Sequence, residues 1–299
     1  MSRALALVML ILAAGPALSA GQAPPAKAAP PAPPPVEVLP VRGGLFLVKG
    51  GSGANAAFFV TKKAVVAIDA KMTPESAAAM LAEIRKITAA PLTTVVITHS
   101  DGDHINGLPG FPKGLRIVAH DRCRADIAEA AKALPGLDDY VPDRTFDRTL
   151  TLGKGAAKIA LSHFGPAHTG GDTVVHFPAL ATVFVGDLLF VGRDPLIHRN
   201  KGGNSFGYVK TLDALLALEP KVRTFLSGHA DPLGRADVEA LRDSLSATQA
   251  RVKALVGEGK GLDEVKKAFG IEDPPDAPGG RRRWLSLVET VYLELTEKK

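Results

Sequence analysis

Four potential metal ligands stand close together in the stretch Thr98-His99-Ser100-Asp101-Gly102-Asp103-His104. The stretch follows a β-branched run, residues 93–98, which is typical of a buried strand. Imidazole and carboxylate are the groups that bind zinc in proteins when no thiolate is present. Without a cation, such groups held together would repel one another and lose their hydration at a high free-energy cost. The stretch therefore predicts a metal site at the end of a strand.

Two further histidines also follow predicted strands and stand beside glycine. His168 lies in GPAHTGGD at 165–172, and His229 lies in SGHAD at 227–231. The ends of strands are where rigid scaffolds place reactive side chains. Both histidines are therefore candidates for the same site as the 98–104 stretch.

Short apolar strands alternate with helical segments along the rest of the chain. Helices are expected at 73–86, 122–133, 208–217, 236–256 and 283–297. Strands are expected at 36–39, 45–48, 56–61, 65–69, 93–98, 116–119, 158–162, 173–177, 182–185 and 224–226. The first helix has a strong start signal, because Thr73 can cap it and Pro74 fits its first turn. The pattern predicts an α/β chain with two sheets or one large sheet, followed by a helical C-terminal tail.

Taken in order, these motifs resemble the metallo-β-lactamase superfamily, whose signature is a HxHxDH loop with scattered ligands and orienting groups. The resemblance covers residues 36–232. It implies a four-layer αββα sandwich, with two mixed sheets face to face, helices outside and metals at one sheet edge. It adds Asp187, in VGD at 185–187, as a carboxylate that bridges two metals. It also adds Asp69, which closes the strand 65–68, as a group that orients the loop without binding metal.

The resemblance divides the ligands between two metal positions. The first metal is held by His99, the residue at 101 and His168, the second by Asp103, His104 and His229, and Asp187 bridges them. The chain departs from the family at Asp101, where imidazole is usual, so that its motif is HxDxDH. A carboxylate there should lower the Lewis acidity of the first metal and favour harder metals relative to zinc. Since aspartate still binds zinc, we expect two Zn²⁺ per chain, with iron or manganese as alternatives; the opposing interpretation is a lost first site.

A centre of this kind implies a metal-dependent hydrolase. The resemblance implies a metal-activated hydroxide that attacks a carbonyl, phosphoryl or sulfuryl centre. Asp103 is the expected catalytic residue, because it can orient the attacking group or carry its proton. The expected substrate is a small ester, thioester, lactone or amide, β-lactams included, since the fold hosts many chemistries and selects none of them.

Two other functions compete with hydrolysis. His99, His168 and Asp187 match the two-histidine, one-carboxylate triad that some relatives use to hold a single iron, which implies a persulfide dioxygenase-like oxidoreductase. Iron content and oxygen uptake distinguish it. The other alternative is a non-catalytic metal-binding accessory protein of the same fold, which would be inert against a broad panel of esters and lactams.

The N-terminus predicts export. Arg3 is followed by an apolar run at 4–14 and by small residues at 17, 19 and 20, which matches a secretory signal peptide over residues 1–20. Residues 21–35 form a Pro/Ala-rich linker, because each proline removes a backbone donor. The folded domain is expected at 36–299, in a periplasmic or secreted protein with no stable membrane insertion after signal cleavage.

Charge argues against a nucleic-acid partner. The net charge of +5 is spread along the chain, and its densest basic run is Arg281–Arg283. A nucleic-acid face would need a clustered stripe, and relatives that process nucleic acid carry a large insertion between the positions of Asp187 and His229, which here are only 42 positions apart. A glutathione-thioester hydrolase would need a cationic C-terminal patch, for which the same basic run is the candidate.

Three residues outside the motifs are expected to be structural. Cys123, the single cysteine, should be a buried thiol without a nucleophilic role. His198 lies in the loop 192–204, which the resemblance places near the mouth of the pocket, and a surface position is expected for it over a role in the site. Trp284 is expected in the core, on one face of the last helix.

Overall fold

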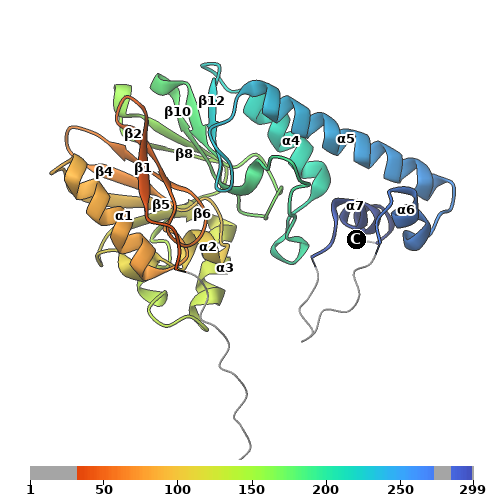
Figure 1. Ribbon diagram of the computed structural model, residues 1–299, viewed down its shortest axis with the longest axis horizontal. Coiled ribbons are helices and arrows are strands. Elements are labelled where there is room, and N and C mark those ends of the chain that lie inside the picture. The colour runs from red at the N-terminus through yellow and green to blue at the C-terminus, as the bar shows by residue number, and fades with distance from the viewer. Residues whose placement is uncertain (1–31, 273–283, 298–299) are drawn as a thin grey trace, which may run out of the picture. The chain divides into compact units, whose positions relative to one another are not determined.

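Two β-sheets form the centre of the structure, a computed structural model that describes residues 32–272 and 284–297 (Figure 1). The first sheet has seven strands in sequential order. They are β1 (Glu37–Arg42), β2 (Leu45–Lys49), β3 (Ala56–Val60), β4 (Val65–Ile68), β5 (Leu92–Val96), β6 (Arg116–His120) and β7 (Arg144–Phe146). The strands from β1 to β4 pair antiparallel, and those from β4 to β7 pair parallel, so the sheet is mixed.

The second sheet has five strands in the order β12-β11-β10-β9-β8. They are β8 (Thr149–Leu152), β9 (Ile159–Ser162), β10 (Val174–Phe177), β11 (Thr182–Phe184) and β12 (Thr224–Leu226). Only β11 and β12 pair in parallel. This sheet is therefore mixed as well, as the sequence predicts.

Apolar side chains fill the space between the two sheets. Phe59 and Leu47 of the first sheet are buried in one cluster with Phe177, Leu161 and Phe184 of the second. The rings of Phe59 and Phe177 meet edge-on, with centroids 5.2 Å apart. Residues that alternate along these strands put one side chain into this cluster and the next toward the helices. The sheets thus pack face to face, as in the predicted sandwich.

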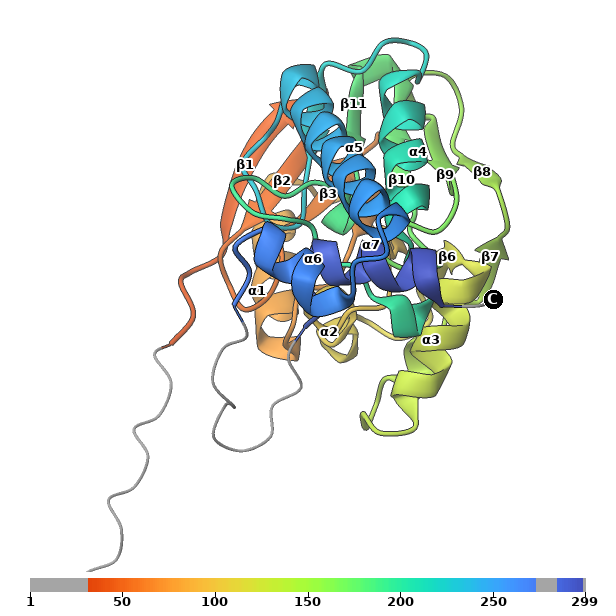
Figure 2. The same cartoon turned by 90° about the vertical axis from the view of Figure 1, so that its right-hand side faces the viewer.

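Helices cover the outer faces of both sheets (Figures 1 and 2). Buried side chains of α1 (Pro74–Ile87) and α3 (Asp121–Ala131) pack with the first sheet. Those of α4 (Ser205–Leu216), α5 (Arg235–Gly257) and α7 (Leu287–Thr296) pack with the second. Two short helices complete the set, α2 (Gly102–Ile105) and α6 (Leu262–Ala268). The four-layer αββα architecture is confirmed.

Local signals explain where α1 begins. Thr73 Oγ1 accepts a hydrogen bond from the backbone N–H of Ser76, and Pro74 occupies the first helical position, where its missing N–H is not needed. Both features agree with the sequence-based expectation. The single cysteine, Cys123, is buried in α3 as expected, and burial raises the pKa of its thiol well above the ordinary value.

The sequence-based expectations were wrong or incomplete in several places. Strands β7 and β8 and helices α2 and α6 were not predicted. Helix α7 begins at Leu287, capped by the Ser286 hydroxyl, which is later than the predicted start at 283. Trp284 therefore precedes the helix and is 62% exposed, where a core position was expected.

Some predictions concern residues that the structure does not describe. The predicted signal peptide at 1–20, most of the linker at 21–35 and the basic run Arg281–Arg283 lie outside the described residues. Within residues 32–272 and 284–297, no helix combines the length and the apolar character needed to cross a membrane.

Candidate metal centre

Loops at one end of both sheets carry the candidate ligands. In the first sheet, Asp69 follows β4 and the stretch 98–104 follows β5, and these two strands are parallel. In the second, Asp187 follows β11 and His229 follows β12, again a parallel pair. His168 lies between β9 and β10. The structure thus gathers side chains from distant parts of the chain, and all seven predicted ligands meet in one cluster.

Asp69 holds both ends of the 98–104 stretch through contacts with Thr98 and His104. Its φ of 60° lies in the left-handed region, which aspartate tolerates better than most residues. Its Oδ1 accepts a hydrogen bond from the Thr98 backbone N–H at 2.8 Å, and its Oδ2 accepts one from the Thr98 hydroxyl at 2.7 Å. The same Oδ2 lies 2.7 Å from Nδ1 of His104. With Nδ1 occupied in this way, His104 has only Nε2 free to bind a metal.

One group of candidate ligands consists of Asp103, His104 and His229, whose ligand atoms all lie within 4.8 Å of one another. His229 Nε2 is 3.1 Å from an oxygen of Asp103 and 3.1 Å from Oδ2 of Asp187. His104 Nε2 is 3.1 Å from Oδ1 of Asp187. Asp187 therefore adjoins both histidines of this group.

A second group consists of His99, His168 and Asp187, all three buried. His99 Nε2 lies 4.0 Å from Oδ2 of Asp187. Nδ1 of His99 lies 3.0 Å from the Thr98 hydroxyl, and Nδ1 of His168 lies 2.8 Å from the Leu196 carbonyl. Both rings therefore turn Nε2 toward the cluster, and Asp187 lies between the two groups.

Asp101 belongs to a third group, with His168 and His198. Its Oδ2 is 2.7 Å from Nε2 of His198, 3.2 Å from Nε2 of His168 and 3.7 Å from Nε2 of His99. Its Oδ1 lies 2.7 Å from the ammonium group of Lys201. Asp101 therefore faces the imidazoles with one oxygen and a lysine with the other.

Unpartnered buried atoms show that the cluster fits a metal ion. Within the described residues, Nε2 of His99, Nε2 of His104 and Oδ1 of Asp187 have no hydrogen-bond partner. A buried polar atom left in this state costs about 1–3 kcal/mol. Imidazole nitrogen and carboxylate oxygen are also the donors that zinc takes from proteins. These three atoms are thus of the kind that a dication would bind.

Burial and charge act differently on the two histidines of the loop. Burial lowers the pKa of His99 well below its ordinary value, so its ring is neutral and has a free lone pair. Burial also acts against a charged His104, but the Asp187 and Asp69 carboxylates outweigh it and raise the pKa of His104 well above the ordinary value.

The more exposed side of the cluster is held together by charge. Hydrogen bonds to Asp103 and Asp187 raise the pKa of His229 to about 9. Burial would raise the pKa of Asp187, but the neighbouring imidazoles reverse this effect and hold it well below the ordinary value. A metal ion at these ligands must therefore displace protons as it binds.

Residues outside the cluster brace its loops. The Asn55 side chain donates hydrogen bonds to the carbonyls of Ser227 and Ala230, at 3.1 and 3.0 Å, on either side of the histidine that follows β12. The hydroxyl of Tyr208, in α4, donates to the backbone carbonyl of Asp187 at 2.9 Å. Such supporting bonds fix the orientation of the ligands.

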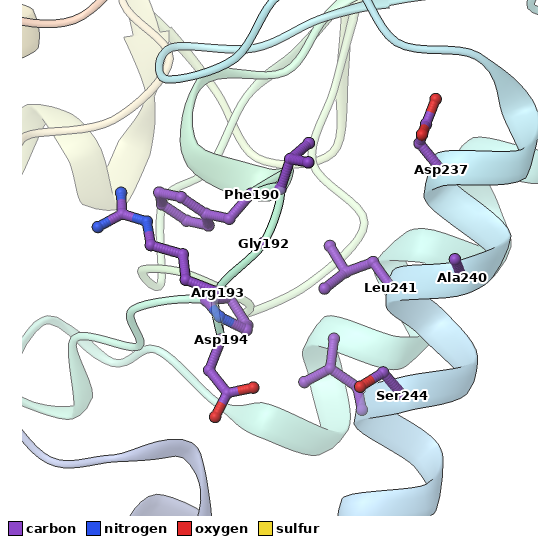
Figure 3. A pocket seen from close by; sticks show the side chains of 11 residues that line it. Phe190, Gly192, Arg193, Asp194, Asp237, Ala240, Leu241 and Ser244 are labelled. Carbon is purple, nitrogen blue, oxygen red and sulfur yellow. The ribbon is translucent and has the colours of Figure 1, made fainter.

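A pocket of about 410 Å³ lies beside the cluster, between the loop 190–195 and helix α5 (Figure 3). The Phe190 ring stacks on His229, with centroids 5.9 Å apart and planes 12° from parallel. The guanidinium of Arg193 lies 4.5 Å from the centre of the Phe190 ring. Leu241 of α5 lines the opposite wall. The pocket therefore offers apolar surface and a cation one ring away from a candidate ligand.

His198 and Lys201 are the two residues that the sequence did not reveal. His198 was predicted at the surface, but it is only 5% exposed and contacts the Trp284 ring edge-on, at 4.8 Å between centroids. Both residues reach Asp101 because the loop 192–204 folds back onto the cluster. No local pattern in a glycine-rich loop indicates such a fold, so the sequence carried no signal for either residue.

Comparisons with known proteins agree with this geometry. A model of the Metallo-beta-lactamase superfamily matches residues 50–229. Metallo-beta-lactamase IND-1 of Chryseobacterium indologenes is 26% identical over 201 residues, which are 65% of this chain and 80% of that protein. The alpha subunit of 2,4-dinitroanisole O-demethylase from a Nocardioides strain is 26% identical over 256 residues, which are 83% of this chain and 74% of that protein.

Among solved structures, a metallo-beta-lactamase from Pontibacter korlensis is similar to this chain with a TM-score of 0.61 at 19% identity. The match covers 71% of this chain and 99% of that protein. A likeness at this level of identity shows a shared fold.

Proposed function

Because the chain belongs to the metallo-β-lactamase superfamily, we propose that it is an exported metal-dependent hydrolase of a small ester, thioester, lactone or amide, β-lactams included. One observation carries the proposal. Two groups of ligand atoms, His99, His168 and Asp187 on one side and Asp103, His104 and His229 on the other, lie next to each other with Asp187 between them. We infer that each group holds one zinc ion, with iron or manganese as alternatives.

The chain's own residues hold the centre in the geometry that hydrolysis needs. A bound pair of dications would supply Lewis acidity and would lower the pKa of a bound water to near neutral pH. Asp187 adjoins both groups, since its Oδ1 faces His104 and its Oδ2 faces His229 and, at a longer distance, His99. Asp69 keeps His104 in the tautomer that presents Nε2.

Asp103 is the residue best placed to move a proton. Its side chain is 27% exposed, whereas those of Asp69 and Asp187 are at most 6% exposed. Its Oδ2 lies 3.1 Å from Nε2 of His229. A carboxylate at the open side of the centre can accept a proton from the attacking water and hand it to the leaving group.

The pocket beside Phe190 suggests how substrates are held. The pocket combines apolar side chains, among them Leu241, with Arg193 and the carboxylates of Asp194 and Asp237. A small acyl substrate with an apolar or aromatic part would lie with its scissile bond at the cluster and the rest in this pocket.

The test is an activity screen of the zinc-loaded protein. The panel contains nitrophenyl esters, thioesters, lactones, β-lactams and, because one relative is an O-demethylase that acts on 2,4-dinitroanisole, that aryl ether. We expect turnover of at least one acyl substrate, abolished by a chelator and restored by added zinc. A protein that binds metal but turns over nothing in the panel would favour the accessory-protein interpretation and contradict the proposal.

One observation supports a second function. His99, His168 and Asp187 form a group by themselves, and two histidines with one carboxylate suit a single ferrous iron that acts with oxygen. This alternative leaves the second group without a role, so hydrolysis is preferred. Iron content close to one per chain together with oxygen uptake on a persulfide substrate would favour the oxygenase.

Export rests on the sequence of residues 1–35. We propose cleavage of a signal peptide over about residues 1–20 and a periplasmic or secreted mature protein. Expression with the native N-terminus, followed by cell fractionation and N-terminal sequencing, tests this directly.

A further inference from the structure

The loop of this chain lacks one imidazole, because Asp101 stands where the family has a histidine. His198 lies against that carboxylate, with Nε2 2.7 Å from Oδ2 of Asp101. The same oxygen is 3.2 Å from Nε2 of His168. Two imidazole nitrogens from distant parts of the chain thus meet at one carboxylate oxygen.

Besides Asp101, the ring of His198 contacts the rings of His168 and Trp284, both edge-on with centroids 4.8 Å apart. It is only 5% exposed, and neither of its ring nitrogens makes a hydrogen bond among the described residues. The polar group near its Nε2 is the Asp101 carboxylate, at the distance of an ion pair, and its Nδ1 has no hydrogen-bond partner there.

The backbone holds His198 rigidly in this place. Its N–H donates to the carbonyl of His168 at 2.8 Å, and its own carbonyl accepts from Lys201 and Gly203, both at 2.9 Å. The Lys201 carbonyl in turn accepts from Gly170, at 2.8 Å. The segment that carries His198 is therefore tied by backbone hydrogen bonds to the loop that carries His168.

Lys201, from the same turn, places a positive charge next to the Asp101 carboxylate. Its ammonium group lies 2.7 Å from Oδ1 of Asp101 and 3.1 Å from the Ser100 carbonyl. This contact occupies one carboxylate oxygen and leaves Oδ2 to the imidazoles. Lys201 thereby offsets the negative charge that Asp101 adds.

We propose that His198 is a metal ligand and, with Oδ2 of Asp101 and with His168, replaces the imidazole that the loop lacks. The proposal rests on the proposed function only in that both require a metal ion in this cluster. Asp101 then does not mark a lost site. It is a ligand whose charge Lys201 balances, in a site completed from the loop after Asp187.

A matched pair of variants tests the proposal, His198→Gln and His176→Gln. His176 is buried in β10 with an unpartnered Nε2, but it belongs to none of the ligand groups among the described residues. Cobalt(II)-loaded protein is studied by proton NMR, where each bound histidine with a protonated second nitrogen gives one strongly shifted, solvent-exchangeable signal. Metal affinity is measured in parallel by competition with a chelator.

We expect His198→Gln to lose one shifted signal and to weaken one metal by more than about 100-fold, beyond the 10–100-fold typical of residues that only orient a ligand. The His176→Gln variant should keep every signal and the wild-type affinity. If His198→Gln keeps all the signals, or weakens binding no more than His176→Gln does, the proposal is overturned.

A second background covers the case in which His198→Gln folds poorly. Asp101→His restores an imidazole to the loop, so His198→Gln should cost less metal affinity there than in the wild type. An equal loss in both backgrounds would contradict the proposal. A wild-type protein that binds two metals and hydrolyses its substrate, with His198→Gln unaffected, overturns only this inference. A wild-type protein that binds no metal overturns the proposed function as well.

Discussion

Oδ2 of Asp69 lies 2.7 Å from Nδ1 of His104, although the two residues are 35 positions apart in the chain. The same carboxylate also accepts both the backbone N–H and the hydroxyl of Thr98. One buried side chain therefore fixes the start of the 98–104 stretch and the ring at its end. This contact sets the direction in which the stretch presents its ligands.

Replacing Asp69 with asparagine should weaken metal binding without unfolding the protein. The amide can still accept the Thr98 N–H, but it cannot satisfy the hydroxyl and His104 as the carboxylate does. We expect metal affinity to fall about 10–100-fold, measured by chelator competition. Unchanged affinity in a variant with a wild-type circular dichroism spectrum would show that Asp69 does not orient His104.

Replacing Asp103 with asparagine separates proton transfer from metal binding. The amide oxygen keeps a weak ligand at 103 but cannot accept a proton, so kcat should fall about 10²–10⁴-fold. Metal content measured at saturating zinc should change far less than kcat. A variant that retains wild-type kcat would remove Asp103 from the mechanism.

Gly228 allows the two sides of the cluster to approach each other. A Cβ atom at this position would lie 2.4 Å from Oδ1 of Asp187 and 2.8 Å from Cε1 of His104. Gly228→Ala should therefore displace ligands and weaken metal binding by about tenfold or more. Gly257→Ala is the control, because nothing lies within 4 Å of its added Cβ, at the end of α5. It should leave metal binding intact and stabilise the fold by roughly 0.5–1 kcal/mol; equal effects of the two variants on metal affinity would contradict the steric argument.

Lys71 predicts a pH dependence of stability. Burial lowers the pKa of Lys71 from 10.5 to about 8, against the attraction of Asp103 and Asp69. Below about pH 8 the lysine is charged in both the folded and the unfolded chain. The folded state then bears the full free-energy cost of burying the charged ammonium group. Between about pH 8 and 10.5 the unfolded chain binds more protons, so the free energy of unfolding rises with pH.

A Lys71→Met variant isolates that effect. Relative to this variant, the wild type should gain on the order of 3 kcal/mol in the free energy of unfolding as the pH rises through that window. Urea unfolding of both proteins in the presence of a chelator measures the difference. A stability difference that stays constant with pH would mean that the buried lysine titrates normally.

Periodicity predicted an α/β chain with two sheets or one large sheet, and the resemblance to the superfamily implied the sandwich. The β-branched run at 93–98 and the start signal at Thr73 are local features, and the structure has a strand and a helix there. Strands β7 and β8 were not predicted because they are only three and four residues long, too short to show a clear alternation of apolar and polar residues. Their strand character comes from pairing with β6 and β9, which no local pattern encodes.

The same distinction applies to the cluster. The seven predicted ligands lie in loops that follow strands. The apolar residues of those strands determine how the strands pair, and this pairing brings the strand ends together. His198 and Lys201 reach Asp101 through backbone hydrogen bonds between two irregular loops. No periodic pattern or fixed spacing in the sequence indicates such contacts, so they can be recognised only in the folded structure.

The most direct test of the account is the metal content of the purified protein after loading with zinc, determined by mass spectrometry beside an Asp101→His variant. The account predicts close to two metals per wild-type chain. It also predicts a shifted metal preference with residual activity in the variant. One metal or fewer per wild-type chain would contradict the two-metal centre.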